Sequence, residues 1–461
     1  MVQLNNTFNQ LKVSEDGPAV QQRPSRPVKA TYRTRTSAEA DDLDLQADSI
    51  VDSTSSSSTQ LLALLSRLFA PLRRSPTFSS TLQHVKGLLY DKQYLVAFGT
   101  ESEEGERWRE VYAARWVPSR AVIYQRIFEE CGIAQHLGWG EGSEDGAGRL
   151  SSEEEELEHE RERARLRRRL RQEGKSADEI SRAVAELEEQ LRKRMALERG
   201  GEGQEVVNAI MIGAGAGSEV VALGAVLGAA AAAASASAQT DDDSMTMERR
   251  VKRAPRIRVQ AIDQGSWDVL LDKMAHGLRT AWPALDGDAG EGKDSAFDVR
   301  FIKGDILDES VAVPSTSTSA SPPSAISAID FASPSLRLIT ICFTISELLL
   351  QSRLKTLQLF SSISHSAPRG TLLLIVESAS LAQIPIGKEG RTYPLGRLLD
   401  HALCGSGAEA DGAGVWEVLK SEDAKWYRMP EDADEVYNAM GKGTKVKLEN
   451  SRVVLRLYRK R

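Results

Sequence analysis

Cysteine is scarce in this chain of 461 residues, and its three cysteines, Cys131, Cys342 and Cys404, lie far apart. An odd number at such wide spacing excludes a disulfide framework and a zinc site of the CxxC type, and it favours a reducing compartment. The six histidines also lack the spacing of metal ligands. We therefore predict no metal site.

Long apolar runs are also lacking. Apolar residues make up 41% of the chain and aromatic residues only 6%, and this apolar share is below that of a typical packed domain. Much of the chain is therefore not expected to bury a core. No stretch of about twenty residues is apolar enough to predict a membrane span, and the N-terminus lacks the apolar core of a signal peptide. We expect an intracellular protein with no membrane partner.

A large positive charge is absent as well, because the formal net charge is -7. Any binding of nucleic acid would therefore depend on local basic patches. Two such clusters are present, at residues 249–253 and 456–461. Both suit phosphate binding, and the first also fits a nuclear import signal.

The N-terminal part of the chain divides in two by composition. Residues 1–80 are rich in Ser, Thr, Gln, Pro and Asp, and we predict them to be mostly disordered, with a helical pattern only over 61–72. Residues 81–150 form a predicted helical extension, in which Ser119 is a candidate cap for a helix that starts at Arg120.

Residues 151–202 are dense in charge and are predicted to form two helices. Ser176 and Glu179 have the spacing of a capping box at the start of the second helix. Two interpretations are open: a solvated insertion, or a surface that docks RNA or a partner protein.

From residue 203 to 461, apolar runs typical of strands alternate with helical patterns. The predicted strands are VVNAIMIG, RIRVQAID, FDVRFIKGDI, LRLITICFTI, GTLLLIVES, WEVLKSEDAKWYRM and SRVVLRLYRK. Helices are predicted after the first, second and fourth strands, so the first five strands should lie parallel in a doubly wound sheet. The last two leave little room for a crossover helix and predict an antiparallel hairpin. The fold class is therefore α/β and Rossmann-like, with a mostly parallel seven-stranded sheet. Low-complexity stretches at about 229–255, 286–294 and 308–334 are predicted insertions.

The most specific motif is NAIMIGAGAGSE, residues 208–219. A strand leads into a glycine-rich turn and then into a helix. Glycine at 213, 215 and 217, with Ala214 between the first two, permits a tight turn and leaves room for a ligand, while the N–H groups of the helix offer donors. Such a turn fits a nucleotide-like cofactor at the carboxyl edge of the sheet, and also a tight turn without a ligand.

Two acidic residues are candidates to hold that cofactor. Asp263 ends the second strand, and its distance from the turn matches a ribose-binding acid once the 229–255 insertion is discounted. Asp305 ends the third strand, where its carboxylate could accept from an adenine amine, with Ile306 against the ring. The alternative for both acids is an ordinary turn or helix-cap residue.

The G-x-G-x-G turn, the second-strand acid, the third-strand Gly-Asp and the terminal hairpin together resemble class I S-adenosylmethionine-dependent methyltransferases. The position of the third glycine in NAD enzymes is Ser218, which argues against a dinucleotide. Methyltransferases of this class usually carry an acid two residues before the first glycine, where this chain has Met211. Glu219, just after the turn, is a candidate to compensate.

Two further segments narrow the resemblance: YAARWVPSRA at 112–121 and FTISEL at 343–348. With the glycine turn, they resemble the fungal 25S rRNA uridine-N3 methyltransferases over about residues 82–135 and 204–461. The resemblance implies that the turn binds S-adenosylmethionine and that the product is N3-methyluridine in large-subunit ribosomal RNA. It also implies a partner in ribosomal RNA or a pre-ribosomal particle, and a nuclear or nucleolar location, with the cytoplasm as an alternative.

Methylation at N3 removes a proton, so a general base should assist. Glu347 lies at the end of the fourth strand in a nearly apolar stretch, where burial could raise its pKa, and Thr344 is a candidate to bond the edge of uracil. The alternative is that Ser346 caps the next helix and Glu347 meets its dipole.

Arg115, Trp116 and Arg120 are the predicted RNA contacts, with Trp116 stacking on a base and the arginines on phosphates. Alternatively, Trp116 is a core residue and the arginines pair with Glu129 or Glu130. Two further function classes remain open for the whole chain. One is a methyltransferase acting on protein or a small molecule, and the other is a catalytically degenerate assembly factor.

Overall fold

The computed structural model of the chain describes residues 57–139, 160–199 apart from 161, 162, 165 and 169, 205–238, 254–286, 295–308, 329–386, 391–405, 415–440 and 443–461. Several predictions fall outside these residues. They are the disorder of residues 1–56, the basic cluster at 249–253, and most of the three low-complexity stretches.

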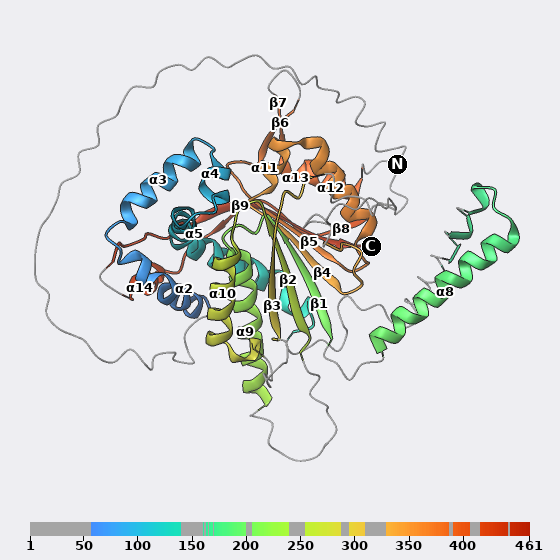
Figure 1. Ribbon diagram of the computed structural model, residues 1–461, viewed down its shortest axis with the longest axis horizontal. Coiled ribbons are helices and arrows are strands. Elements are labelled where there is room, and N and C mark those ends of the chain that lie inside the picture. The colour runs from blue at the N-terminus through green and yellow to red at the C-terminus, as the bar shows by residue number, and fades with distance from the viewer. Residues whose placement is uncertain are drawn as a thin grey trace, which may run out of the picture.

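A seven-stranded sheet forms the centre of the molecule (Figure 1). Its strands are β1 (Val206–Ile212), β2 (Arg256–Asp263), β3 (Phe297–Lys303), β4 (Leu336–Cys342), β5 (Leu372–Ser378), β8 (Trp416–Tyr427) and β9 (Ser451–Lys460). They are ordered β3-β2-β1-β4-β5-β9-β8. The first five are parallel, while β9 runs antiparallel to both β5 and β8. The predicted fold class, including the antiparallel C-terminal pair, is confirmed.

Helices cover both faces of the sheet. On one face lie α9 (Ser218–Ala238) and α10 (Asp268–Ala281), and on the other α11 (Ile345–Gln351), α12 (Arg353–Ser366) and α13 (Leu395–Cys404). Strand β1 shows why both faces are apolar: Ala209 and Met211 belong to the buried cluster on one face, and Ile210 and Ile212 to that on the other. This alternation is the two-residue period of a strand buried on both sides.

Helix α9 continues through the alanine run as far as Ala238, so the start of the predicted insertion at 229 is helical. Among the described residues it is the one helix long and apolar enough to cross a membrane by length and composition. Its segment from Val220 to Leu227 is buried in the core shared with the sheet. That burial accounts for its apolar character as a core helix.

The N-terminal helices α2 (Ser57–Arg73), α3 (Phe78–Tyr90), α4 (Tyr94–Gly99), α5 (Glu103–Glu130) and α6 (Ile133–His136) pack beside α9 and α10 (Figure 1). The helical pattern predicted over 61–72 is confirmed by α2, whereas the predicted disorder of the other residues from Ser57 to residue 80 is wrong. Leu61, Leu65 and Phe69 of α2 are fully buried in the same cluster as the sheet residues. The sequence did not reveal the burial of this helix, because its partners α5 and α10 are distant in sequence.

Helix α5 runs straight through Pro118, whereas the sequence predicted a helix start at Arg120. Its N-cap is Ser102, whose side chain accepts from the backbone N–H of Gly105. Proline cannot donate to the carbonyl four residues earlier, so Ala114 would lack its helical hydrogen bond. The hydroxyl of Tyr437 donates to that carbonyl oxygen at 2.6 Å. A side chain from the β8–β9 connection thereby satisfies the position that Pro118 leaves open.

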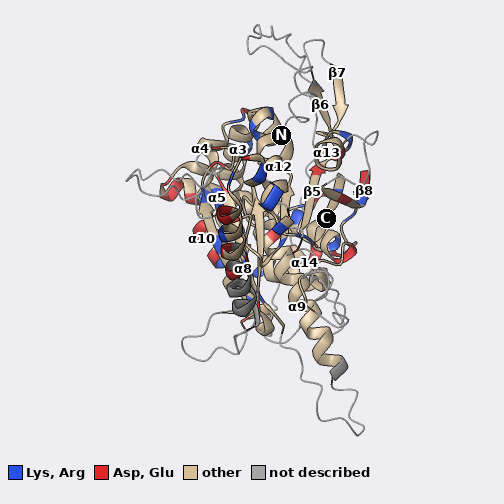
Figure 2. Ribbon diagram, turned by 90° about the vertical axis from the view of Figure 1, so that its right-hand side faces the viewer, with Lys and Arg blue, Asp and Glu red and all other residues tan. Residues whose placement is uncertain are grey.

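Several shorter elements were not predicted. Strands β6 (Gln383–Ile386) and β7 (Arg391–Pro394) form a separate antiparallel pair that projects from the molecule (Figure 2). Helix α14 (Ala433–Asn438) lies in the β8–β9 connection, where little room for a helix was expected, and it packs on α2.

Helix α8 (Ala177–Arg199) is the second predicted charged helix. Its capping box is formed as predicted, since Ser176 N donates to Glu179 Oε2 at 2.9 Å and Glu179 N donates to Ser176 Oγ at 3.3 Å.

Candidate functional site

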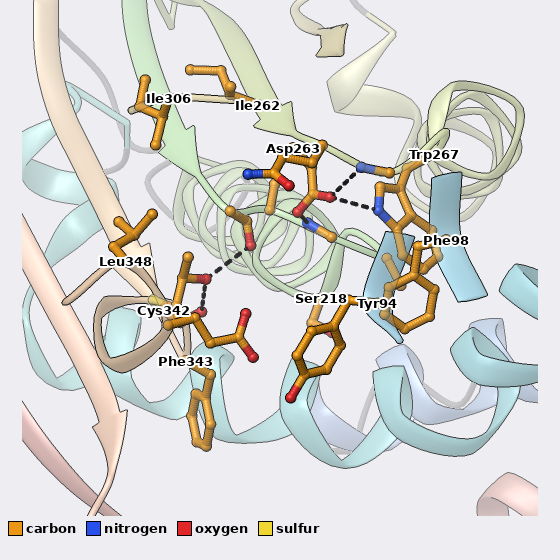
Figure 3. A pocket seen from close by; sticks show the side chains of 18 of the residues that line it. Tyr94, Phe98, Ser218, Ile262, Asp263, Trp267, Ile306, Cys342, Phe343 and Leu348 are labelled. Carbon is orange, nitrogen blue, oxygen red and sulfur yellow. Dashed lines mark hydrogen bonds between the residues drawn. The ribbon is translucent and has the colours of Figure 1, made fainter. Parts of the chain in front are cut away.

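A cavity of about 700 Å³ lies at the carboxyl edge of β1, β2 and β4, and α4 and α5 form its opposite wall (Figure 3). Its size is within the range of small-molecule sites. The lining combines the glycine turn, carboxyl groups, aromatic rings and two cationic side chains. It includes Lys92, Tyr94, Phe98, Tyr112, Trp116, Arg120, Tyr124, Gly213, Ala214, Gly215, Ser218, Glu219, Asp263, Trp267, Ile306, Phe343, Thr344, Glu347 and Gln351.

The glycine turn has the backbone conformation that its sequence requires. Gly213, Gly215 and Gly217 have φ angles of 69°, 48° and 77°, which favour glycine. Gly213 and Gly215 line the cavity together with Ala214. Gly217 was predicted to contact the cofactor, but it is not part of the lining: a Cβ there would overlap Leu271 of α10. Its role is close packing of the turn on that helix.

Asp263 lies beside the turn, as predicted after discounting the insertion. Its Oδ2 accepts from Gly215 N at 3.0 Å, and its Oδ1 accepts from Gly265 N and Trp267 Nε1 at 2.8 and 3.0 Å (Figure 3). Burial raises the pKa of this carboxyl, and these donors partly offset the effect. The three donors hold the carboxylate in one orientation at the cavity wall.

Glu219 projects from the first turn of α9 into the cavity and is buried. It accepts a hydrogen bond from the hydroxyl of Thr340 on β4. Burial raises its pKa to about 8, and the nearby Asp263 adds to the shift. Met211, which occupies the usual position of the acid, is buried in the core and is not part of the lining.

Asp305 does not line the cavity, although its neighbours Gly304 and Ile306 do. Its Oδ1 accepts from Leu307 N at 2.8 Å, and its Oδ2 accepts from Gln351 Nε2 at 2.6 Å. The lining does not support the predicted contact with adenine, which stays a prediction. The carboxylate forms the turn after β3 and orients the Gln351 amide, which does reach the cavity.

Glu347 and Thr344 both line the cavity at the end of β4. The Glu347 carboxyl stays accessible from the cavity, yet the surrounding walls raise its pKa to about 7, with Glu377 and Asp263 adding to the shift and Arg120 opposing it. The Thr344 hydroxyl donates to backbone carbonyls, 3.2 Å from Gly213 O and 3.1 Å from Cys342 O. It joins the turn to β4, so its proton is not available to uracil.

The alternative for this segment, that Ser346 caps the helix, is not what the structure shows. Thr344 is the N-cap residue and makes no capping bond with its side chain. The buried carboxylate of Glu377 at the end of β5 accepts from Ser346 N at 3.0 Å. Glu377 therefore accepts from the start of α11. The other part of the alternative is confirmed, since Glu347 lies in the first turn of α11, and it also lines the cavity.

Of the three predicted RNA contacts, two line the cavity and one does not. The Arg120 guanidinium donates to the Tyr112 hydroxyl at 2.8 Å and lies 5.5 Å from the Phe343 ring centroid. Trp116 stacks with Tyr112, their ring centroids 4.7 Å apart. Arg115 lies outside the lining and pairs with Glu449.

The predicted alternative partners of these arginines have other contacts. Glu129 accepts from Ser57 and Gln125, and Glu130 accepts from Lys425 at 2.6 Å, as well as from Lys420 and Tyr427. In the C-terminal basic cluster, Arg456 is buried between Asp400 and Asp423 and Arg459 pairs with Glu417. Much of that cluster's charge is therefore used inside the protein. No cluster of three metal-ligating side chains occurs within the described ranges.

Sequence reasoning missed the aromatic wall of the cavity. Tyr94 and Phe98 come from α4, and Phe98 lies 4.9 Å from the ring of Trp267 (Figure 3). Tyr124 lies 6.0 Å from Phe343. Trp267 carried a usable signal, because it lies four residues after Asp263 at the start of the next predicted helix. The α4 aromatics carried none, since the sheet residues they face are more than 160 positions away.

A family model described as "Putative SAM-dependent methyltransferase" matches residues 65–459. The chain belongs to this family. It is therefore a methyltransferase whose cofactor is S-adenosylmethionine. The match includes the N-terminal helices from α2 onward, which agrees with their burial in the common core.

A curated relative of this methyltransferase is the 25S rRNA (uridine(2843)-N(3))-methyltransferase of Saccharomyces cerevisiae. It is 24% identical over 387 residues, which cover 84% of this chain and 78% of the relative. Among solved structures, a SAM-dependent methyltransferase from Methanosarcina mazei is 9% identical with a TM-score of 0.26, covering 56% and 94% of the two chains. The glycopeptide N-methyltransferase MtfA, complexed with S-adenosyl-L-methionine, is 11% identical with a TM-score of 0.24, covering 58% and 92%. TM-scores this low carry no argument about substrate.

The residues of the cavity fit the cofactor of this methyltransferase. A Cβ at Gly215 would lie 3.8 Å from Asp263 Oδ2 and would narrow the space between turn and acid. Asp263 retains acceptor capacity for ribose hydroxyls, because three of about four lone-pair positions of a carboxylate are used. Ile306 adds an apolar side chain to the lining and Glu219 a carboxyl group beside the turn, and their predicted contacts with the adenine and methionine parts stay predictions.

Proposed function

We propose that the protein methylates N3 of a uridine in large-subunit ribosomal RNA. The observation that carries the proposal is Glu347, a carboxyl group with a pKa of about 7 in the same cavity as the glycine turn. A base of that pKa suits removal of a proton near neutral pH. The yeast relative, which is named for this reaction, supports the choice of substrate.

The side chains of the cavity divide the work. When bound, S-adenosylmethionine supplies an electrophilic methyl group. The Glu347 carboxylate takes the N3 proton as the N3–methyl bond forms, and the Arg120 guanidinium donates to a uracil carbonyl oxygen as negative charge develops on the ring. Phe343 and Trp116 offer aromatic faces to a uracil turned out of its stack. In this proposal Trp116 and Arg120 contact the base, and the predicted phosphate contact of Arg115 is dropped.

The proposal places the protein in rRNA processing and ribosome biogenesis, with a nuclear or nucleolar location. The test is to map N3-methyluridine in large-subunit rRNA from cells with and without the gene, and to repeat the assay with the Glu347→Gln variant. We expect one uridine to lack its methyl group in cells without the gene and in cells with the Glu347→Gln variant. An unchanged map would refute the substrate.

A parallel assay separates the other candidates. Purified protein with labelled donor is offered ribosomal RNA precursors or a protein extract. Label in protein alone would favour a different acceptor. Failure to bind the donor, with retained binding to ribosomal precursors, would favour an assembly factor.

A further inference from the structure

Two strained residues mark the mouth of the cavity. Lys92 and Phe343 are the non-glycine residues with positive φ in the described part of the chain, at 56° and 55°, and both line the cavity. Residues other than glycine seldom have a positive φ, and those that do cluster at functional sites. Phe343 belongs to the proposed catalytic cavity. Lys92 lies on its opposite side, between α3 and α4, and no role has yet been given to it.

The conformation of Lys92 is imposed by the end of α3. Lys92 N donates to Leu89 O at 3.1 Å, and Gln93 N donates to Leu88 O at 2.8 Å, which is the bonding pattern of a helix C-terminus that usually contains glycine. A lysine is therefore present where glycine would be less strained. The structure of the turn gives no reason for the lysine, so its cation needs another explanation.

The surface around Lys92 is unusually apolar for exposed residues. Tyr90 is 89% exposed, and across the mouth Leu350 of α11 is 69% exposed. We call the exposed residues on the two sides of the mouth the rim. Of the rim residues, Lys92, Tyr94, Leu95 and Leu350 line the cavity, while Tyr90, Arg353 and Leu354 are their exposed neighbours along the chain. Tyr94 lines the same cavity as Glu347, and burial together with the nearby Glu347 raises the pKa of its hydroxyl.

We propose that the rim binds the single-stranded RNA nucleotides that flank the target uridine. The inference rests on the proposed function and adds the surface that holds the RNA outside the cavity. Aromatic side chains beside cations are the features that bind single strands, through base stacking and phosphate contacts. Lys86, one turn before Tyr90, adds a third positive charge to those of Lys92 and Arg353. These three positive charges outnumber the negative charge of the exposed Asp91.

The charge inside the cavity explains why the backbone of the RNA should stay at the rim. Three carboxyl groups, those of Glu219, Asp263 and Glu347, line the interior. Glu219 keeps its proton near neutral pH, because its pKa is raised to about 8. The other two, when ionised, disfavour entry of a phosphate, whereas a neutral uracil can enter. The predicted contact Arg115 cannot replace the rim, because its guanidinium pairs with Glu449 outside the cavity.

The test uses the full chain and a fluorescein-labelled single-stranded oligouridylate, with affinity measured by anisotropy at several salt concentrations. The variant is Lys92→Gly, which relieves the strained conformation while removing the cation. We expect a melting temperature equal to or above that of the wild type, unchanged donor affinity, and a loss of oligouridylate affinity of threefold or more. One lost phosphate contact should also reduce the slope of log K against log salt by about 0.7.

Matched controls make the result specific. Lys445→Gly is the control for Lys92→Gly and removes an exposed lysine from the loop before β9. Tyr90→Ser removes an exposed aromatic ring from the rim, and Trp426→Ser, which removes one from β8, is its control. The proposal that the rim binds RNA is refuted if Lys92→Gly binds oligouridylate as tightly as the wild type. It is also refuted if Lys445→Gly lowers the affinity as much as Lys92→Gly does. Retained uridine methylation in those variants leaves the proposed function intact. If the wild-type protein itself does not methylate uridine, the proposed function is refuted.

Discussion

Gly213, Gly215 and Gly217 share a positive φ, yet each is glycine for a different reason. A Cβ at Gly213 would overlap Thr344, and one at Gly217 would overlap Leu271. A Cβ at Gly215 would meet only ordinary contacts, the nearest at 3.8 Å from Asp263. Side chains at 213 and 217 would therefore damage the fold, whereas a small one at 215 would chiefly occupy the cavity.

Gly215→Ala should consequently separate binding from folding. We expect donor affinity to fall tenfold or more by calorimetry, because the methyl group enters the space between turn and acid. The backbone strain, about 1 kcal/mol, should lower the melting temperature by only a few degrees. Gly132→Ala is the control, since Gly132 is outside the cavity lining, has a left-handed backbone with φ 61° and ψ 33°, and a Cβ there would meet only an ordinary contact at 3.6 Å. It should show the same loss of stability with normal donor binding. Donor affinity left unchanged by Gly215→Ala would contradict the assigned site.

Glu347 makes a prediction about pH. Its carboxyl must be deprotonated to act as a base, and its pKa is about 7. Single-turnover methylation should therefore slow by about tenfold per pH unit below pH 7 and level off above it. Glu347→Gln should lower the rate by about 10²–10⁴-fold and abolish this pH dependence, with unchanged donor affinity. A variant that keeps the wild-type pH profile would exclude Glu347 as the base.

At the scale of elements, the strands were predictable, whereas the packing of the N-terminal helices into the common core was not. The central strands are nearly continuous apolar runs, such as Leu372–Ser378, that suit few other structures. Helix α2 is apolar on one side only, and its stability depends on α5 and α10, which a local pattern cannot reveal. Likewise Asp263 could be assigned from strand order, while Tyr94 and Phe98 reach the cavity only through tertiary packing.

Helix α5 is the element most clearly completed from elsewhere in the chain. Pro118 leaves the Ala114 carbonyl without a helical donor, and the Tyr437 hydroxyl supplies one. Tyr437→Phe should therefore lower the free energy of unfolding by about 1–3 kcal/mol, the cost of an unpaired buried carbonyl. Urea denaturation measures the change.

A double-mutant cycle identifies the cause of that loss. Pro118→Ala restores the backbone N–H, so in that background Tyr437→Phe should cost markedly less. Equal costs in both backgrounds would mean that the tyrosine hydroxyl does not compensate for the proline.

At the scale of the whole molecule, the fold brings several carboxyl groups together in one cavity. Burial raises the pKa of Glu219, Asp263 and Glu347 within a single enclosure. The sheet brings these residues together from the ends of β2 and β4 and the start of α9. A protein without its donor therefore has a reason to be less stable at higher pH, because each carboxylate that forms there is poorly hydrated.

The raised pKa of Glu219 predicts the direction of the pH dependence of stability and the pH range over which it occurs. The folded state keeps its proton up to about pH 8, whereas the unfolded state loses it near 4.5. The folded state thus binds more protons between these values, so the free energy of unfolding should fall as pH rises through them, by up to about 1.4 kcal/mol per pH unit. Glu219→Gln should flatten the dependence between pH 5 and 8 in urea titrations, while Glu186→Gln, exposed on α8, should leave it unchanged. A Glu219→Gln variant with the same pH dependence as the wild type would show that Glu219 is ionised in the folded protein.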